Sequence, residues 1–298
     1  MNISHLYSAI LKGKWAIEPR FMDSLYPIVS GLFDRNMSNS FDGEAPELIL
    51  QIASNETVLE SVNAFGEEKS GSVFDSAPKG SIAIIPLKGT MLKEDTMCAY
   101  GTRTIGSVML EAVAHENISG IILDIDSGGG AVDAIAPIKY AIEKAHEAKM
   151  KVLALADMAA SAAYYAASFA DHIMADNNIS SEFGSIGVMV SFQDVQPYYE
   201  EMGVKFHTIY APESTHKNQG FELARQGKYE LIKKETLSPL AKDFMRTVRN
   251  NRNGKVNLTI PGILNGRMFY AKEAKKHGLI DSMGNIDLAI RKLNKISN

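Results

Sequence analysis

Residues 120–161 read GIILDIDSGGGAVDAIAPIKYAIEKAHEAKMKVLALADMAAS, and this stretch decides the fold class. Its two apolar runs, GIILDID (120–126) and KVLALAD (151–157), are typical of strands buried in a parallel sheet. Residues 131–148 between them have the length and the apolar spacing of a helix. A strand, a crossover helix and a second strand together predict an α/β fold with a mostly parallel sheet.

The same alternation of strands and helices continues along the chain from residue 81. Further strands are expected over 81–89, 172–175, 187–192 and 205–211, and further helices over 102–117, 160–170, 194–203, 221–249, 271–277 and 286–293. Before residue 80 the pattern differs, because the polar stretches 36–45 and 66–80, which contain Gly and Ser, are typical of linkers. The sequence therefore predicts an N-terminal arm or subdomain over 1–79 and one α/β domain over 80–298.

The composition is that of a folded protein without a nucleic-acid surface. Of the 298 residues, 45% are hydrophobic and 22% are charged, which is enough to build a core and too apolar for a disordered chain. The formal charge of −4 leaves no broad basic surface for a phosphate backbone. Cys98 is the only cysteine, which excludes an internal disulfide and a cysteine zinc cluster, and we expect it to be buried.

No segment predicts export or a membrane span. The N-terminal apolar run Ala9–Leu11 is too short for the core of a signal peptide. The stretch 152–169 is apolar but contains Asp157, Ser161 and Ser168 and is rich in alanine, so a buried strand and helix explain it better than a membrane helix. The expected location is cytoplasmic, with no integral membrane segment.

Three consecutive glycines follow the first of the two central strands. Glycines at 128–130 let the backbone approach a bound group closely and aim N–H groups at an anion, as a phosphate loop or an oxyanion hole requires. The segment lacks the Lys-Ser/Thr pair of a P-loop and the GxGxxG spacing, which disfavours a nucleotide. A flexible tight turn is the alternative interpretation.

Ser161 lies where the second central strand passes into a helix. The small residues around it in ADMAASAAYY (156–165) leave its hydroxyl unshielded, and a helix start behind it favours developing negative charge. Serine is also common at helix N-caps, so this position fits a structural cap as well as a nucleophile. The choice depends on whether a base is available.

The loop APESTHKNQG (211–220) offers two candidate bases, His216 and Lys217, between a predicted strand and a predicted helix. A lysine acts as a general base near neutral pH only if burial or nearby positive charge lowers its pKa. Four other histidines lie in the N-terminal arm or on predicted helices with charged neighbours and are expected at the surface: His5, His115, His146 and His277.

Taken in order, five segments resemble the S49 serine peptidases, which include the signal peptide peptidase A type and the phage prohead proteases. The segments are IILDIDSGGGAV, LALADMAASAAYYAA, EFGSIGVMV, the loop with Lys217, and NGRMFYAKEAKKHGLIDSMGN. The resemblance spans roughly residues 80–295. It implies a ClpP/crotonase-like superhelix of ββα units and a peptidase catalytic domain over 80–298, with no cofactor and no metal.

The resemblance also implies roles for single residues. Ser161 matches the nucleophile and Lys217 the base of a Ser-Lys dyad. Gly129, with Gly130 beside it, matches the loop that supplies one oxyanion N–H, and Ala162 would supply the other from its backbone. Ser185, in Gly184–Gly187, matches a position that helps to place the lysine. Gly266-Arg267, Ala274 and Gly278–Asp281 match a structural C-terminal signature.

The sequence departs from the family pattern at three places: alanines at 162 and 163 replace Gly-Gly, Gly128 replaces Pro, and Asn218 replaces Asp. None removes a reactive group, although the alanines narrow the space around Ser161. His216 remains the alternative base.

The resemblance further implies a homo-oligomer and a peptide or protein substrate. Trp15–Pro19 is similar to the start of phage members, which favours a capsid-maturation protease acting on scaffold or capsid protein within a prohead. The alternatives are a cytoplasmic protease of the signal peptide peptidase type, an acyl-CoA enzyme of the crotonase type, and a catalytically silent scaffold protein.

Overall fold

The computed structural model describes residues 15–17, 47–54, 57–64, 71–96, 99–192 and 194–297. Its strands are β1 (Trp15–Ile17), β2 (Ile49–Ser54), β3 (Thr57–Asn63), β4 (Ser81–Lys88), β5 (Ile118–Ser127), β6 (Gly129–Ala131), β7 (Lys151–Ala160), β8 (His172–Ala175), β9 (Glu182–Gly184), β10 (Met268–Tyr270) and β11 (Ser282–Met283). Its helices are α3 (Thr102–Ala114), η1 (Val132–Ala134), α4 (Ile135–Glu147), α5 (Ala162–Ala167), α6 (Gln196–Glu201), α7 (Gln219–Arg225), α8 (Glu230–Ile232), η2 (Lys233–Leu237), α9 (Ser238–Asn251), α10 (Ala271–Lys276) and α11 (Ile286–Ser297).

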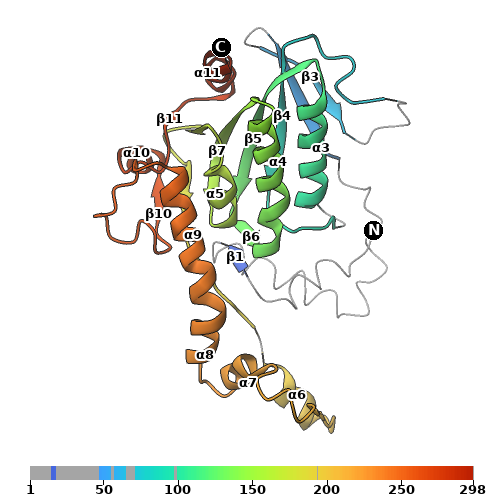
Figure 1. The fold of residues 1–298 in the computed structure, drawn as a ribbon, viewed down its shortest axis with the longest axis vertical. Coiled ribbons are helices and arrows are strands. Elements are labelled where there is room, and N and C mark those ends of the chain that lie inside the picture. Colours follow the sequence, from blue (N-terminus) through green and yellow to red (C-terminus); the bar gives the residue numbers. More distant parts are fainter. Residues whose placement is uncertain are drawn as a thin grey trace.

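A mostly parallel sheet forms the centre of the fold (Figure 1). Strands β4, β5 and β7 pair in parallel in its middle, and β2 and β3 add an antiparallel edge beside β4. On the other side β7 has two parallel neighbours, because residues 153–156 pair with β8 and residues 158–160 pair with β9. The predicted α/β class with a mostly parallel sheet is confirmed.

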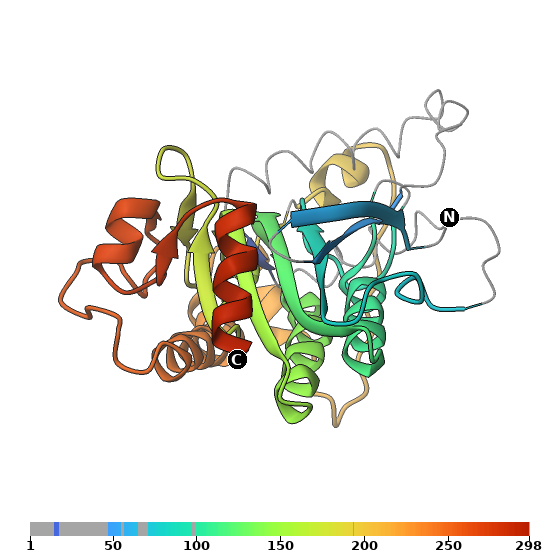
Figure 2. The ribbon, with the colours of Figure 1, turned by 90° about the horizontal axis from the view of Figure 1, so that it is seen from above.

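Side chains of the central strands alternate between two apolar layers. Ile121 and Leu123 of β5 lie in the larger core, which includes buried residues of α3 and α4. Ile122 between them belongs to a second core with Ile290 and Leu293 of α11, which covers the opposite face (Figure 2). Because both faces are covered, successive residues of these strands are apolar, which explains the continuous runs in the sequence.

Most of the predicted elements are found. The strands expected over 81–89, 120–126, 151–157 and 172–175 correspond to β4, β5, β7 and β8. The helices expected over 102–117 and 131–148 correspond to α3 and to η1 with α4. The helix expected over 160–170 is shorter, because α5 begins only after Ser161.

Two predicted strands are wrong. Residues 187–192 make a single bridge, from Met189 to Trp15, instead of a strand. Residues 205–211 have no regular secondary structure and pair with no strand in the described part of the chain. Their side-chain pattern suits a strand, but a strand needs a free partner edge, and sequence periodicity says nothing about whether one is within reach.

The N-terminal region contributes strands at two places in the fold. Strands β2 and β3 join the central sheet through β2 and β4. Strand β1 lies elsewhere and pairs with β6 in a small two-stranded sheet. The predicted linker 36–45 and Cys98 fall outside the described residues, and the boundary between 79 and 80 stays a prediction.

Residues 194–232, hereafter the projection, extend away from the sheet and its covering helices (Figure 1). The projection contains α6, α7 and α8, and it is joined to the body of the molecule by η2 and α9. The helical run from α8 to the end of α9 covers residues 230–251, a length of about 33 Å at 1.5 Å per residue. The loop that carries His216 and Lys217 therefore lies far from the sheet.

Candidate active site

Ser161 forms the turn between β7 and α5 in a strained conformation. Its φ of 52° and ψ of −118° lie outside the regions that non-glycine residues usually adopt. The turn is fixed on both sides, since the Ser161 N–H donates to the Gly184 carbonyl at 2.8 Å and the Tyr165 N–H donates to the Ser161 carbonyl at 2.9 Å. Strain of this kind is retained where the surrounding structure fixes it, and it clusters at functional sites.

Small, buried residues flank Ser161 in the chain. Ala160, Ala162 and Ala163 are fully buried, and Ser161 itself is 1% exposed. The hydroxyl donates one long hydrogen bond, 3.4 Å, to the carbonyl oxygen of Gly187. The side chain is therefore shielded from solvent, with a backbone carbonyl as its hydrogen-bond partner.

The glycine loop lies directly against this turn. Gly129 has a φ of +92°, and a Cβ added there would clash with the carbonyl oxygen of Ala16 and lie 2.8 Å from the Ala162 nitrogen. A Cβ added to Gly130 would clash with the backbone of Met91. Both positions therefore require glycine, and the three predicted oxyanion residues are brought together beside Ser161.

Ser127 holds the glycine loop in place, a role that the sequence did not indicate. Its hydroxyl donates to the Gly89 carbonyl at 2.5 Å and accepts the Gly129 N–H at 3.1 Å. The predicted oxyanion donor Gly129 is thus engaged with Ser127, so its use in catalysis requires that this hydrogen bond be shared or exchanged. A buried serine just before a glycine run is the signal that could have identified this contact.

Ser185 lies close behind the serine turn. Its φ is 51°, it is 7% exposed, and its N–H donates to the Arg267 carbonyl at 3.1 Å. The neighbouring Gly184 accepts the Ser161 N–H, and β9 pairs with β10 of the C-terminal region. Residues 184–185 therefore connect the serine turn to the C-terminal segment.

The candidate bases lie on the projection, away from Ser161. Lys217 is exposed in the turn before α7, where its backbone N–H donates to the Ser214 carbonyl at 3.1 Å. His216 is also exposed, and its Nε2 lies 2.8 Å from Glu235 Oε2. Figure 1 shows that α7, which begins just after these two residues, lies far from α5, which begins just after Ser161, so neither base meets Ser161 within one chain.

Four more described histidines make polar contacts elsewhere. His115 contacts Asp75, His146 contacts Asp171, His172 contacts Ser282 and His277 contacts Glu273. The expectation of a surface position is wrong for His277, which is 7% exposed and packs its ring against Phe269. Within the ranges described, no cluster of three or more His, Cys, Asp or Glu side chains could hold a metal ion.

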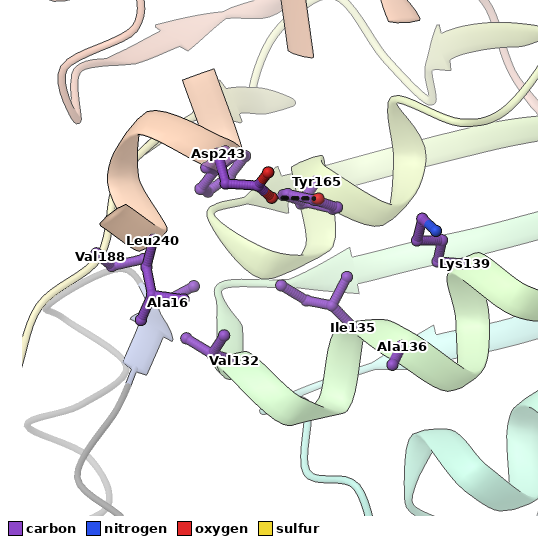
Figure 3. Close-up of a pocket in the computed structure, with 10 residues that line it drawn as sticks. Ala16, Val132, Ile135, Ala136, Lys139, Tyr165, Val188, Leu240 and Asp243 are labelled. Atoms are coloured by element: carbon purple, nitrogen blue, oxygen red, sulfur yellow. Dashed lines mark hydrogen bonds between the residues drawn. The ribbon is translucent and has the colours of Figure 1, made fainter. Parts of the chain in front are cut away.

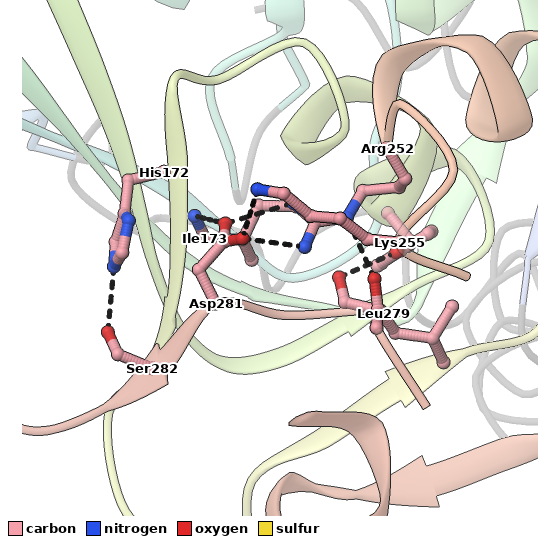
Figure 4. A network of polar contacts seen from close by, with 9 residues as sticks. His172, Ile173, Arg252, Lys255, Leu279, Asp281 and Ser282 are labelled. Carbon is pink, nitrogen blue, oxygen red and sulfur yellow. Dashed lines mark hydrogen bonds and ion pairs between the residues drawn. The ribbon is translucent and has the colours of Figure 1, made fainter. Parts of the chain in front are cut away.

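The C-terminal signature supports the helix that follows Ser161. Asp281 accepts two hydrogen bonds from the buried Arg252, at 2.8 and 2.9 Å, and one from Lys255 at 2.8 Å (Figure 4). The Tyr164 hydroxyl, at the start of α5, donates to the Leu279 carbonyl at 2.7 Å. The predicted structural role of residues 278–281 thus has a physical basis.

This network shifts two pKa values. Burial by itself would raise the pKa of Asp281, but hydrogen bonds from Arg252 and Lys255 outweigh it and hold the pKa well below its ordinary value. Burial lowers the pKa of His172 to about 4, and the nearby charge of Asp281 opposes this only in part. His172 is therefore a neutral ring at neutral pH, hydrogen-bonded to Ser282.

None of the helices in the described ranges is both long and apolar enough to cross a membrane.

The comparisons with known proteins agree with the motifs. Residues 144–298, more than half of the chain, match the sequence profile described as Peptidase family S49. A putative protease of Methanocaldococcus jannaschii is 27% identical over 183 residues, which cover 61% of this chain and 58% of the relative. Protease 4 of Haemophilus influenzae is 24% identical over 219 residues, which cover 73% of this chain and 35% of the relative.

Two further proteins, one curated relative and one solved structure, are also similar to this chain. A chloroplastic serine protease SPPA of Arabidopsis thaliana is 28% identical over 231 residues, which cover 71% of this chain and 32% of the relative. A solved mutant of the 1510-N membrane-bound stomatin-specific protease superposes with a TM-score of 0.44 at 17% identity, covering 74% of this chain and 84% of the other. The chain thus aligns with about a third to three fifths of the length of these curated relatives. On the profile match, this protein belongs to peptidase family S49.

Proposed function

We propose that the protein is a serine endopeptidase in which Ser161 is the nucleophile. The observation that carries this proposal is the strained turn of Ser161, buried among alanines and in contact with a loop that must be glycine at positions 129 and 130. A serine that served only as a helix cap would accept a hydrogen bond from the helix backbone, and Ser161 makes no such side-chain bond to α5.

In the proposed reaction the Ser161 oxygen attacks the carbonyl carbon of a peptide bond while its proton moves to the uncharged amine of Lys217. The resulting oxyanion is stabilised by the backbone N–H of Ala162 and by an N–H of the loop at Gly129 and Gly130. The C–N bond then breaks, and Lys217 returns the proton to the leaving amine. Water hydrolyses the acyl-serine ester and regenerates Ser161.

We infer that Lys217 reaches Ser161 from a second copy of the chain. Within the described residues, Gly187 is the only hydrogen-bond partner of the Ser161 hydroxyl, and a carbonyl oxygen cannot take up its proton. Lys217 lies on the projection, where Phe206, Ile209 and Tyr210 are exposed. Exposed apolar side chains that gather on one extension are typical of an interaction surface. Burial against a second copy would also disfavour the charged form of the lysine.

Intact-mass analysis of wild type and Ser161→Ala tests the proposed chemistry. Each protein is incubated alone and with unfolded casein, after its oligomeric state has been measured. We expect fragments from the wild type only. Equal fragmentation by the two proteins would exclude Ser161 as the nucleophile. No fragmentation by either, with both proteins folded and oligomeric, would favour a catalytically silent scaffold.

For the biological role we propose maturation of a phage or prophage capsid, with scaffold or capsid protein as the substrate. The support is the similarity of Trp15–Pro19 to the start of phage members. A gene position between a portal gene and a major capsid gene would support this role. A position among cell-envelope genes would favour a protease of the signal peptide peptidase type instead.

A further inference from the structure

Strand β1 is held on both edges by segments of the proposed active site. On one edge Trp15, Ala16 and Ile17 pair antiparallel with Ala131, Gly130 and Gly129 of the glycine loop. On the other edge the Trp15 N–H donates to the Met189 carbonyl at 3.1 Å, and the Met189 N–H donates to the Trp15 carbonyl at 2.9 Å. A three-residue strand thus fills a slot between two backbone edges.

The carbonyl of Ala16 lies beside the proposed oxyanion site. A Cβ added to Gly129 would meet both the Ala16 oxygen and the Ala162 nitrogen. Because these two atoms approach one point, a carbonyl of β1 lies next to the N–H group that is proposed to stabilise the oxyanion. Under the proposed mechanism, a peptide substrate would present its own carbonyl in this place.

A cavity opens next to the side chain of Ala16. It has a volume of about 260 Å³, and its mostly apolar walls include Val132, Ile135, Val188 and Phe244 (Figure 3). Tyr165 and Asp243, joined by a hydrogen bond of 3.2 Å, also line it. Ala16 is one of the residues that line this cavity, so we expect a larger apolar side chain at its position to extend into it.

Two backbone edges that both pair with the inserted strand, and an apolar pocket beside them, are the elements of peptide recognition by strand addition. We propose that the slot held by Trp15–Ile17 is the peptide-binding groove, and that β1 is an internal occupant which an extended apolar peptide displaces. This inference rests on the proposed function, because it takes Ser161 and Ala162 as the reacting end of the groove. It also implies that the free enzyme is partly blocked by its own chain.

Trp15 makes this proposal directly measurable. It is the only tryptophan of the chain and is 1% exposed, so its fluorescence emission reports whether β1 is docked. The probe is a synthetic peptide that copies residues 12–20, with phenylalanine at the Trp15 position and leucine at the Ala16 position. It is added to full-length Ser161→Ala, which cannot cleave it under the proposed mechanism, and binding is followed separately by the anisotropy of a fluorescein-labelled copy.

We expect the unlabelled peptide to shift the Trp15 emission to longer wavelength, and the shift should saturate. Its midpoint should lie at the peptide concentration at which binding of the labelled copy is half-maximal. With Ala16→Leu added to the protein, the leucine side chain of β1 should occupy the cavity and hold the strand in place. The midpoint should then rise at least about tenfold. Adding Ala16→Asp places a charge in the apolar slot and lowers the midpoint by at least about tenfold. A matched peptide with proline at the Ala16 position lacks the N–H for pairing and should leave the emission unchanged.

Binding of the labelled peptide with unchanged Trp15 emission would show that β1 is a permanent part of the fold, and it would overturn the proposal. The proposal would also be overturned if the labelled peptide bound neither Ser161→Ala nor its combinations with Ala16→Leu and Ala16→Asp. Equal midpoints of the Trp15 emission shift in the two Ala16 variants would overturn it as well. If the protein with Ala16→Asp does not fold, the comparison between Ser161→Ala and Ser161→Ala/Ala16→Leu still tests the proposal. These readouts need no catalysis, so failure of Ser161 as a nucleophile appears only in the casein experiment and is distinguishable.

Discussion

The hydroxyl oxygen of Ser161 lies 3.4 Å from the carbonyl oxygen of Gly187, and no other hydrogen bond to this hydroxyl occurs within the described ranges. A carbonyl oxygen can hold the hydroxyl in place but cannot remove its proton. The proposed base, Lys217, lies on the projection instead. The proposed site is therefore complete only if the projection of one chain reaches the serine of another.

This arrangement predicts complementation between two inactive proteins. Ser161→Ala and Lys217→Ala should each be inactive alone. An equal mixture, dissociated and reassembled together, should regain about one quarter of the wild-type rate, because one site in four combines an intact serine with an intact lysine. The measurement is cleavage of casein by oligomers that mass spectrometry shows to be mixed.

The matched control for this experiment is wild type mixed equally with the double variant Ser161→Ala/Lys217→Ala. A dyad within one chain keeps half of the sites active in that mixture, whereas a dyad between chains keeps about a quarter. No recovery in verified mixed oligomers, together with half activity in the control, would place both residues in one chain.

A second prediction concerns alanine substitutions in the glycine loop. Comparing them with a matched glycine elsewhere separates the cost of backbone strain from the cost of a steric clash. Gly129 and Gly266 have the same φ, +92°, but a Cβ at Gly266 would meet nothing within 4 Å. Gly266→Ala should therefore cost only the strain, about 1 kcal/mol of unfolding free energy, and keep its activity. Gly129→Ala adds clashes with the Ala16 oxygen and the Ala162 nitrogen, and it should lose at least about 100-fold in kcat/KM.

Urea unfolding and casein cleavage, measured on both variants, check this prediction. Equal activity of Gly129→Ala and Gly266→Ala would mean that the loop at Gly129 takes no part in the reaction.

The central sheet could be predicted from the sequence because its signal is local. Continuous apolar runs such as 120–126 and 151–157 record burial on both faces, and the helices between them fix the parallel arrangement. The positions of Ser161 and of the glycine loop at the ends of these strands could also be predicted, because both follow the strands directly, whereas their roles in catalysis stay predictions.

The features that could not be predicted depend on contacts between residues that lie far apart in the sequence. The run 205–211 has residue types that suit a strand, but it lies on the projection, away from the sheet, and pairs with no described strand. Strand β1 has only three residues, and its partners Gly130 and Met189 are more than a hundred positions away. The distance between Ser161 and Lys217 depends on how the projection is placed, and no periodicity encodes this.

The buried ion pair of the C-terminal signature predicts a large loss of stability. In Asp281→Asn the Arg252 guanidinium, whose side chain is 3% exposed, loses its counter-charge while it stays buried. Breaking such a pair from one side costs about 3–5 kcal/mol of unfolding free energy. The exposed pair between Lys233 and Glu230 is the matched control, and Glu230→Gln should cost less than about 1 kcal/mol.

Urea denaturation at neutral pH measures both costs. A loss below about 1 kcal/mol in Asp281→Asn would mean that the Arg252–Asp281 pair is not held in the closed, desolvated form that the structure describes.

His172 predicts how stability responds to mild acid. Its folded-state pKa of about 4 lies below its ordinary value of 6.5, so between these values the unfolded chain binds a proton that the folded protein does not. The contribution of His172 to stability is therefore fully present above pH 6.5 and is lost as the pH falls to about 4. Allowing for the partial exposure of the ring, the loss should be about 2 kcal/mol.

The variant His172→Gln can still hydrogen-bond Ser282 but has no ring to protonate, so its unfolding free energy should fall less steeply between pH 6.5 and 4 than that of the wild type. The pKa of Asp281 is lowered in the folded protein, so this carboxyl is protonated only at more acidic pH than the range from 6.5 to 4. Its contribution to the unfolding free energy is therefore lost below that range. Urea titrations at half-unit pH steps separate the two groups, and equal slopes for wild type and His172→Gln would mean that the ring is already protonated in the folded protein.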